Sequence, residues 1–130
     1  MQPANRNALL SLLAVLVLVL VRAPVAWPSD WTSLLKDKAV TDFNQQDLDA
    51  YLKTVYALLD APLPAAPVEW SNKKTGVGAR LEVIGQPRVA GFSECRRVRT
   101  NVYSPKRKAE SRTWTACRDS DGEWSLAKGS

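Results

Sequence analysis

Two cysteines near the end of the chain stand at equal distances from a central polar turn. Cys95 and Cys117 lie on either side of Lys106, which falls in residues 104–108, a polar run with a proline and the composition of a turn. If the flanking segments fold back about Lys106, the two cysteines face each other across neighbouring strands. We therefore predict a cross-strand disulfide, which restricts this part of the chain to an antiparallel β hairpin.

The beginning of the chain has the composition of a secretory signal. Residues 8–21 are apolar except for Ser11, and they follow a short start that carries Arg6. This run is shorter than the roughly 20 residues of a membrane-spanning helix and matches the apolar centre of a signal peptide. We expect residues 1–27 to be a removed signal or a retained membrane anchor, with residues 8–27 associating with the membrane. No cysteine precedes Cys95, so a bacterial lipoprotein anchor is not expected.

Charge divides the rest of the chain into two parts of opposite sign. Residues 28–66 hold three lysines and six aspartates, whereas residues 67–130 hold thirteen basic and seven acidic side chains. We expect the acidic part to be a helical segment with a proline-rich connection, and residues 67–127 to be a small β domain. Opposite net charges would allow the two parts to face each other.

The acidic part has the pattern of one clear helix. Asn44 is suited to cap it, and Asp47 in its first turn suits the positive end of the helix dipole. Apolar residues recur at helical spacing until residues 61–67, where three prolines end the helix. A shorter helix is expected over residues 30–38. The residues predicted to face inward are Trp31, Leu34, Leu35, Leu48, Tyr51, Leu52, Val55, Leu58 and Leu59.

The basic part has the pattern of five short strands separated by turn residues. In the hairpin, Val98 falls opposite Trp114 on the face away from the cysteines, and such a pair suits a core face. The predicted fold is therefore α+β, with an N-terminal signal or anchor helix, one or two amphipathic helices and an antiparallel β domain that carries the disulfide. The predicted strands are residues 68–72, 77–84, 92–103, 109–118 and 123–126.

Two groups of motif residues resemble a known family. The first is W-S-N-x-x-T-G-x-G, and the second combines C-R with A-C-R-x-x-D-G-x-W. Together they resemble the C-terminal domain of the rickettsial 17-kDa surface antigen family of bacterial envelope proteins, over residues 67–127. The resemblance implies a small β domain in the cell envelope without an established catalytic role. Besides Cys95 and Cys117, the motif residues singled out are Trp70, Asn72, Gly76, Gly78, Asp121, Gly122 and Trp124.

The residue types that usually carry catalysis are sparse. The chain has no histidine, no serine in a nucleophile elbow and no glycine-rich phosphate loop between a strand and a helix. Asp119, Asp121 and Glu123 are too few for a calcium loop and suit a solvated turn. We therefore expect a protein that is not an enzyme and that has no metal or cofactor.

A cluster of basic residues on the predicted hairpin is the main candidate binding site. It either protects an edge strand from aggregation or binds an anion such as lipopolysaccharide phosphate, acidic phospholipid, cell-wall polymer or an acidic protein. Export argues against nucleic acid as the partner. Arg97 and Arg99 share the cysteine face, whereas Arg96, Arg112 and Arg118 share the other. The full set is Arg96, Arg97, Arg99, Lys106, Arg107, Lys108, Arg112 and Arg118.

These observations favour a non-catalytic interaction module of the bacterial cell envelope, at the surface or in the periplasm. The expected partner is an envelope protein, or an anionic polymer or lipid of the envelope. Two alternatives remain open at this point. One is an accessory subunit of an inner-membrane complex, held by an uncleaved N-terminal helix, and the other is a small periplasmic inhibitor of a cell-wall hydrolase.

Overall fold

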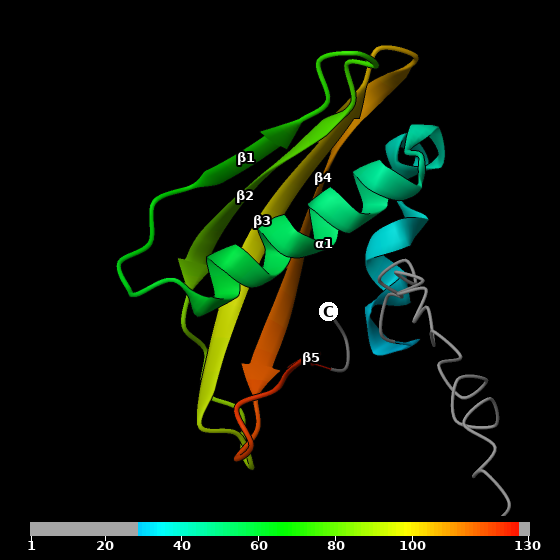
Figure 1. Ribbon diagram of the computed structural model, residues 1–130. Helices are drawn as coiled ribbons and strands as arrows, with labels where there is room; N and C mark the ends of the chain where they lie inside the picture. The colour runs from blue at the N-terminus through cyan, green and yellow to red at the C-terminus, as the bar shows by residue number, and fades with distance from the viewer. Residues whose placement is uncertain (1–28, 128–130) are drawn as a thin grey trace, which may run out of the picture.

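A single antiparallel sheet carries helical elements on one of its faces (Figure 1). The computed structural model describes residues 29–127, so the predicted signal or anchor of residues 1–27 lies outside the described residues. Among residues 29–127, no helix is long and apolar enough to cross a bilayer. The elements are the 3-10 helices η2 (Ser29–Lys36) and η3 (Lys38–Asp42), helix α1 (Gln45–Asp60), and strands β1 (Val68–Ser71), β2 (Gly78–Gly85), β3 (Glu94–Ser104), β4 (Arg107–Arg118) and β5 (Trp124–Leu126).

The predicted α+β class and the disulfide hairpin are confirmed. The strands follow one another as a meander, in the order β1-β2-β3-β4-β5, and their ends differ from the predicted ends by at most two residues. Cys95 pairs with Cys117 in the β3–β4 register and is bonded to it, and Val98 pairs with Trp114. The register shifts between Val102 and Ser104, so β4 accommodates an extra residue beside the turn.

Helix α1 begins and ends where its sequence signals predict. The Asn44 side chain accepts a hydrogen bond from the Asp47 backbone N–H at 2.9 Å, and the Asp47 carboxylate accepts one from the Asn44 N–H at 3.0 Å. Asp47 is buried, and its second oxygen accepts a 2.7 Å hydrogen bond from the amide of Asn72. The N-terminal cap of the helix is thus tied to the turn after β1.

The predicted short helix over residues 30–38 is instead two 3-10 helices separated at Asp37. The backbone of Asp37 is extended, with φ −64° and ψ 133°, and its carboxylate points inward to a 2.8 Å ion pair with Arg112. This break turns the acid toward its partner on β4, which a continuous helix would not do. Trp31 and Leu34 are buried as predicted.

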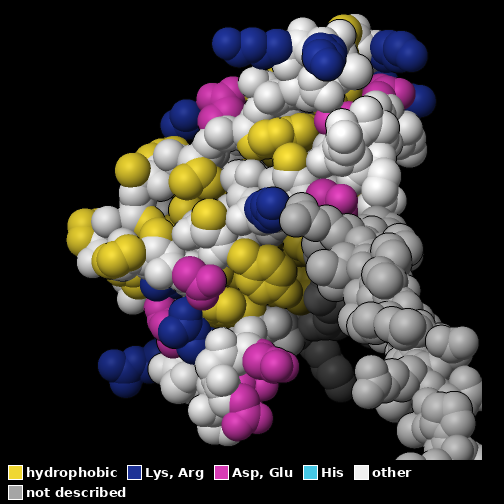
Figure 2. Space-filling model, viewed as in Figure 1, with side chains coloured by type: hydrophobic (Ala, Val, Ile, Leu, Met, Phe, Trp, Pro, Cys, Tyr) yellow, Lys and Arg dark blue, Asp and Glu magenta, His cyan; other side chains and the backbone are white. Residues whose placement is uncertain are grey.

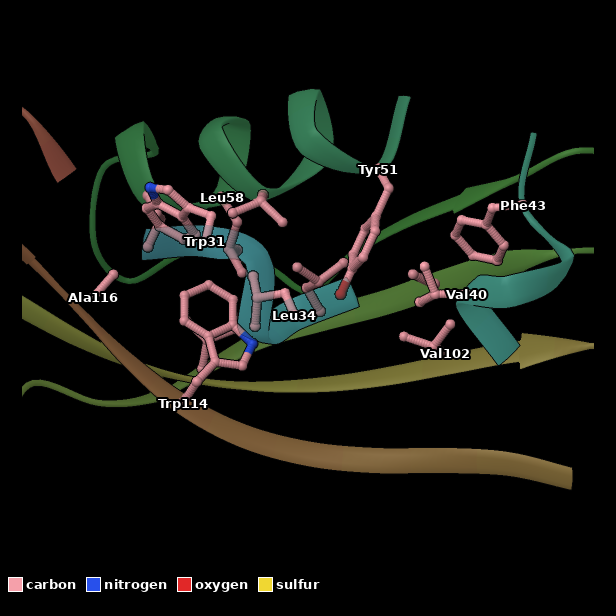
Figure 3. Close-up of a cluster of buried hydrophobic side chains, with 14 of the residues drawn as sticks. Trp31, Leu34, Val40, Phe43, Tyr51, Leu58, Val102, Trp114 and Ala116 are labelled. Carbon is pink, nitrogen blue, oxygen red and sulfur yellow. The ribbon is translucent and has the colours of Figure 1, made fainter. Parts of the chain in front are cut away.

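One hydrophobic core lies between the helical layer and the sheet (Figure 3). The Trp31 ring meets the Trp114 ring edge-on, with centroids 5.8 Å apart, and Trp114 donates a 2.7 Å hydrogen bond from its indole N–H to the Thr100 hydroxyl. Phe43 packs against Trp70 with ring centroids 5.4 Å apart, which leaves Trp70 half-buried at the edge of the core. The acidic and the basic parts of the sequence therefore share one core.

We expect Gly78→Ala in β2 to destabilise the domain by about 1–3 kcal/mol, as overpacking of a tight site does. A Cβ at Gly78 would lie 2.6 Å from the carbonyl oxygen of Trp70 and would also overlap the Tyr103 hydroxyl. Gly85→Ala in the same strand is the control, because its Cβ would meet Arg97 at an ordinary 3.7 Å. Urea unfolding measures both variants, and equal losses would contradict the steric explanation.

Candidate anion-binding surface

The predicted alternation of the hairpin arginines between two faces is found in the register, and it gives the arginines different roles. Arg97 and Arg99 are exposed and stand on the sheet face of the two buried cysteines, away from the helical layer, and Arg99 forms a 2.9 Å ion pair with Glu82 of β2. Arg96, Arg112 and Arg118 stand on the face that the helical layer covers. These three covered arginines form hydrogen bonds or ion pairs with residues of the helical layer.

Arg96 is buried and holds the end of α1 on the sheet. Its guanidinium donates to the backbone oxygens of Leu58 at 3.0 Å and Ala61 at 2.7 Å, and it pairs with Glu94 at 2.9 Å. The last carbonyls of a helix lack partners within the helix and carry partial negative charge, so a cation satisfies them well. This arginine stabilises the packing of α1 and has little surface left for an external ligand.

Arg118 and Trp124 together bind the last residue of α1. The Arg118 guanidinium carbon lies 4.5 Å from the centroid of the Trp124 ring, a cation–π geometry. Both side chains donate to the same oxygen of Asp60, Trp124 at 2.9 Å and Arg118 at 3.2 Å. An aspartate at a helix C-terminus opposes the dipole, and these two donors offset that cost. The short strands beside turns predict that Trp70 and Trp124 are both largely buried; Trp124 is buried, whereas Trp70 is only half-buried.

Arg112 and Arg107 complete the contact between the hairpin and the helical layer. Arg112 pairs with the buried Asp37 and donates to the Ser33 carbonyl at 3.1 Å, while Arg107 pairs with Asp42 at 3.2 Å. Burial raises the pKa of Asp37 above its usual range, and Arg112 opposes that rise only in part.

The Asp42 carboxylate has a second donor on the hairpin. The Ser104 hydroxyl donates to it at 2.6 Å, and this hydrogen bond, followed by the charge of Arg107, lowers the pKa of Asp42. Three aspartates of the helical layer, Asp37, Asp42 and Asp60, therefore meet three arginines of the hairpin. The acidic part and the basic part of the sequence therefore form the two sides of one interface.

Three of the eight predicted basic residues form no side-chain hydrogen bond or ion pair within residues 29–127. Arg97, Lys106 and Lys108 are exposed, and their side chains make no hydrogen bond or ion pair with the described residues 29–127. Lys106 and Lys108 flank the β3–β4 turn, whereas Arg97 lies on the open sheet face near the other end of β3. The structure thus divides the candidate set into five paired arginines and three unpaired cations.

The structure adds two lysines that the sequence prediction left out of the set. Lys73 and Lys74 lie in the β1–β2 turn, which meets the β3–β4 turn, since a Cβ on Gly76 would come 2.8 Å from Cγ of Pro105. Both turns form the upper end of the sheet in Figure 1, and basic side chains stand over this end in Figure 2. We call the four exposed lysines of this end, Lys73, Lys74, Lys106 and Lys108, the cationic tip.

The family-like motif residues hold turns and do not gather into one site. The Asn72 side chain accepts from the Lys74 N–H at 3.0 Å, and its backbone oxygen accepts from Gly76 N–H at 2.7 Å. Gly76 has φ +77° and Gly122 has φ +82°, a left-handed conformation that favours glycine. Trp70, Asn72, Gly76 and Gly78 lie by the cationic tip, whereas Asp121, Gly122 and Trp124 lie at the β4–β5 turn.

A hollow of about 520 Å³ lies beside the β4–β5 turn, lined in part by Trp31, Tyr56 and Trp124. Both tryptophans are almost fully buried, so the hollow offers a ligand little aromatic surface. Asp119 accepts hydrogen bonds from the backbone N–H groups of Asp121 and Glu123, at 2.9 and 3.0 Å, and so closes the turn. Among residues 29–127, no group of three or more potential metal ligands is present.

Comparisons with known proteins add no relative. No family model matches the chain, and no curated protein or solved structure matches it. The resemblance to the rickettsial 17-kDa surface antigen family therefore stays a prediction that rests on the motif residues. What is established for this chain is a disulfide-linked α+β domain with one helical layer and a five-stranded antiparallel sheet.

Proposed function

We propose that this chain is a non-catalytic interaction module of the bacterial cell envelope, exported to the periplasm, whose cationic tip binds an anionic polymer or lipid headgroup. The disulfide is typical of exported domains and supports the compartment. The observation that carries the binding site is the contact between the two lysine-bearing turns. The proposal moves the expected anion site from the arginines of the strands to the lysines of the turns.

The concentration of like charge at the tip supports a binding role. Four exposed lysines and Arg107 lie in or directly beside two turns that contact each other, and among the described residues only Arg107 of these five forms an ion pair with an acidic side chain. Neighbouring like charges destabilise the folded state through repulsion. An anionic ligand would remove that repulsion, and the packing of Gly76 on Pro105 limits the ordering entropy that binding costs.

The residue type at the tip indicates the kind of ligand. Lysine acts as a mobile point charge, whereas the planar fork of arginine recognises single phosphates or carboxylates by shape. The arginines of this hairpin are mostly used inside the fold, so the tip is suited to diffuse binding of repeated negative charges. We therefore expect binding of a polyanion whose strength depends steeply on ionic strength.

Inorganic polyphosphate is a suitable probe, and isothermal titration at low and high salt measures its binding. We expect the variant with Lys73→Gln, Lys74→Gln, Lys106→Gln and Lys108→Gln to bind about tenfold more weakly at low salt, since each lysine near a charged surface contributes up to roughly 1 kcal/mol before screening. Its free energy of unfolding should be equal to or greater than that of the wild type, because the change removes repulsion between neighbouring like charges.

A matched control removes the same net charge elsewhere. Lys36→Gln, Lys53→Gln, Arg88→Gln and Arg97→Gln change four exposed basic residues away from the tip. This control should retain most of the polyphosphate affinity. Equal weakening in both variants would show that binding follows net charge and not the tip, and salt-insensitive binding by the wild type would contradict an electrostatic site.

A further inference from the structure

The exposed large hydrophobic side chains of the domain are confined to one short stretch of chain. Among residues 29–127, only Ile84, Val89 and Phe92 belong to this class, with exposed fractions of 38%, 36% and 39%. All three lie at the end of β2 or in the connection from β2 to β3. We call residues 84–92 the apolar loop. Single exposed hydrophobics are ordinary on protein surfaces, whereas a group of them marks a contact surface.

The apolar loop is held in place where it joins β3, and its outer residues are exposed. Ser93 donates from its backbone N–H and its hydroxyl to the Arg118 carbonyl, both at 3.2 Å, and Cys95 follows with its disulfide. Residues 87–95 surround a hollow of about 490 Å³, and Val89 and Phe92 remain exposed beside it. The loop therefore presents its apolar side chains outward from a rigid support.

The apolar loop itself carries one charge, which is basic, whereas Glu94 follows at its base and the β4–β5 turn at the same end of the sheet holds Asp119, Asp121 and Glu123. Arg88 is the only charged residue in residues 83–93, and Arg97, which pairs with Gly85 across β2 and β3, is exposed and without an internal partner among the described residues. Exposed apolar side chains with arginines beside them suit the boundary between acyl chains and anionic headgroups.

The apolar loop lies at the same end of the sheet as the start of η2. Ser29 begins η2, whose Trp31 lines the same hollow as Trp124 and Ser125 of β5. Strand β5 pairs with the last residues of β4, and Arg118 at that end also binds Ser93 at the base of the loop. In Figure 1 this end is the lower one, opposite the cationic tip. In the sequence, only residues 22–28 separate Ser29 from the apolar residues 8–21.

We propose that the apolar loop docks the domain on an anionic phospholipid bilayer, with Val89 and Phe92 in the interfacial region and Arg88 and Arg97 at the headgroups. The inference rests on the proposed envelope function and adds an orientation to it. The strands of the hairpin, at about 3.3 Å per residue, separate the loop from the cationic tip by most of the length of the sheet. The tip then points away from the bilayer, toward soluble or wall-bound anions.

The test places a tryptophan at each end of the full-length protein, reconstituted in vesicles of phosphatidylethanolamine and phosphatidylglycerol. Phe92→Trp reports on the loop, and Ala109→Trp, at an exposed position of β4 beside the tip, is the matched control. Brominated acyl chains quench only tryptophans within the bilayer. Difference spectra against the wild type isolate the added residue from the five native tryptophans.

We expect the emission added by Phe92→Trp to be quenched about twofold or more by the brominated lipids, and that added by Ala109→Trp to be unchanged, because interfacial insertion reaches only about 5–10 Å. Adding Arg88→Gln and Arg97→Gln to Phe92→Trp should reduce its quenching. Quenching of neither residue, or of Ala109→Trp alone, would overturn the docking. A blue shift of Phe92→Trp that grows with protein concentration and ignores lipid would assign the loop to a second copy of the chain.

Each of the two proposals can be contradicted by experiment while the other stands. If polyphosphate binding depends on the cationic tip while Phe92→Trp is not quenched, the proposed function stands and the docking on lipid is wrong. If Phe92→Trp is quenched while the tip variant binds polyphosphate normally, the docking stands and the anion site is wrong. Equal quenching at both positions would show that the domain lies flat on the bilayer, which contradicts the orientation.

Discussion

Arg96→Met should lower the free energy of unfolding by about 2–4 kcal/mol, because it leaves the buried carbonyl of Leu58 and the partly buried carbonyl of Ala61 without donors, at roughly 1–3 kcal/mol for each unsatisfied group. Methionine keeps much of the aliphatic volume but supplies no donor. The carbonyls of Leu58 and Ala61 would lose donors at 3.0 and 2.7 Å, whereas the carboxylate of Glu94, which is partly exposed, can be hydrated by water. Small domains have roughly 5–15 kcal/mol in total, so this single change removes a large share of it.

The neighbouring arginine provides the control for Arg96. Arg97→Met changes the same residue type one position along β3, but on the exposed face, and should alter stability by no more than about 0.5 kcal/mol. Urea unfolding measures both variants, and hydrogen exchange should show faster opening of residues 58–61 in Arg96→Met only. Similar losses in the two variants would mean that α1 does not depend on the guanidinium.

Replacing both cysteines by alanine should lower the free energy of unfolding by about 2–5 kcal/mol. The bond joins residues 22 apart in the sequence and so restricts the unfolded chain more than the folded hairpin. The strands should still pair below the lowered melting temperature, because Val98 and Trp114 remain buried opposite each other. Calorimetry of the variant and the wild type measures the difference.

Reduction of the wild-type disulfide provides the control for the double cysteine variant. Dithiothreitol should lower the melting temperature of the wild type toward that of the double variant and leave the variant unchanged. Non-reducing peptide mapping of protein from the envelope should link Cys95 to Cys117. Recovery of both as thiols that react with an alkylating agent, without prior reduction, would contradict both the bond and the exported compartment that it supports.

The elements of this fold follow from short-range patterns in the sequence. The equal spacing of Cys95 and Cys117 about Lys106 predicts the hairpin register from Glu94 to Val102, because a strand alternates strictly between two faces. Asn44 and Asp47 predict the start of α1, since the capping box is complete within four residues. Both signals depend only on neighbours in the chain or on one hairpin.

The contacts between elements needed the tertiary structure. Alternation assigns Arg96 to the covered face, but its bonds to Leu58 and Ala61 depend on where α1 ends over the sheet. The break at Asp37 likewise depends on the place of Arg112, because the buried ion pair forms only when the helical layer docks on β4. Local helix preference does not contain this information.

The candidate site shows the same division. The sequence by itself predicts the disulfide between Cys95 and Cys117 and the pairing of the two strands of the hairpin. It also shows the excess of basic residues in the second half of the chain. Only the tertiary structure decided which cations serve the fold and which remain for a ligand. Lys73 and Lys74 are more than thirty residues from Lys106 and Lys108, and they form one cationic tip only because the turns of two hairpins in the same antiparallel sheet come together at one end.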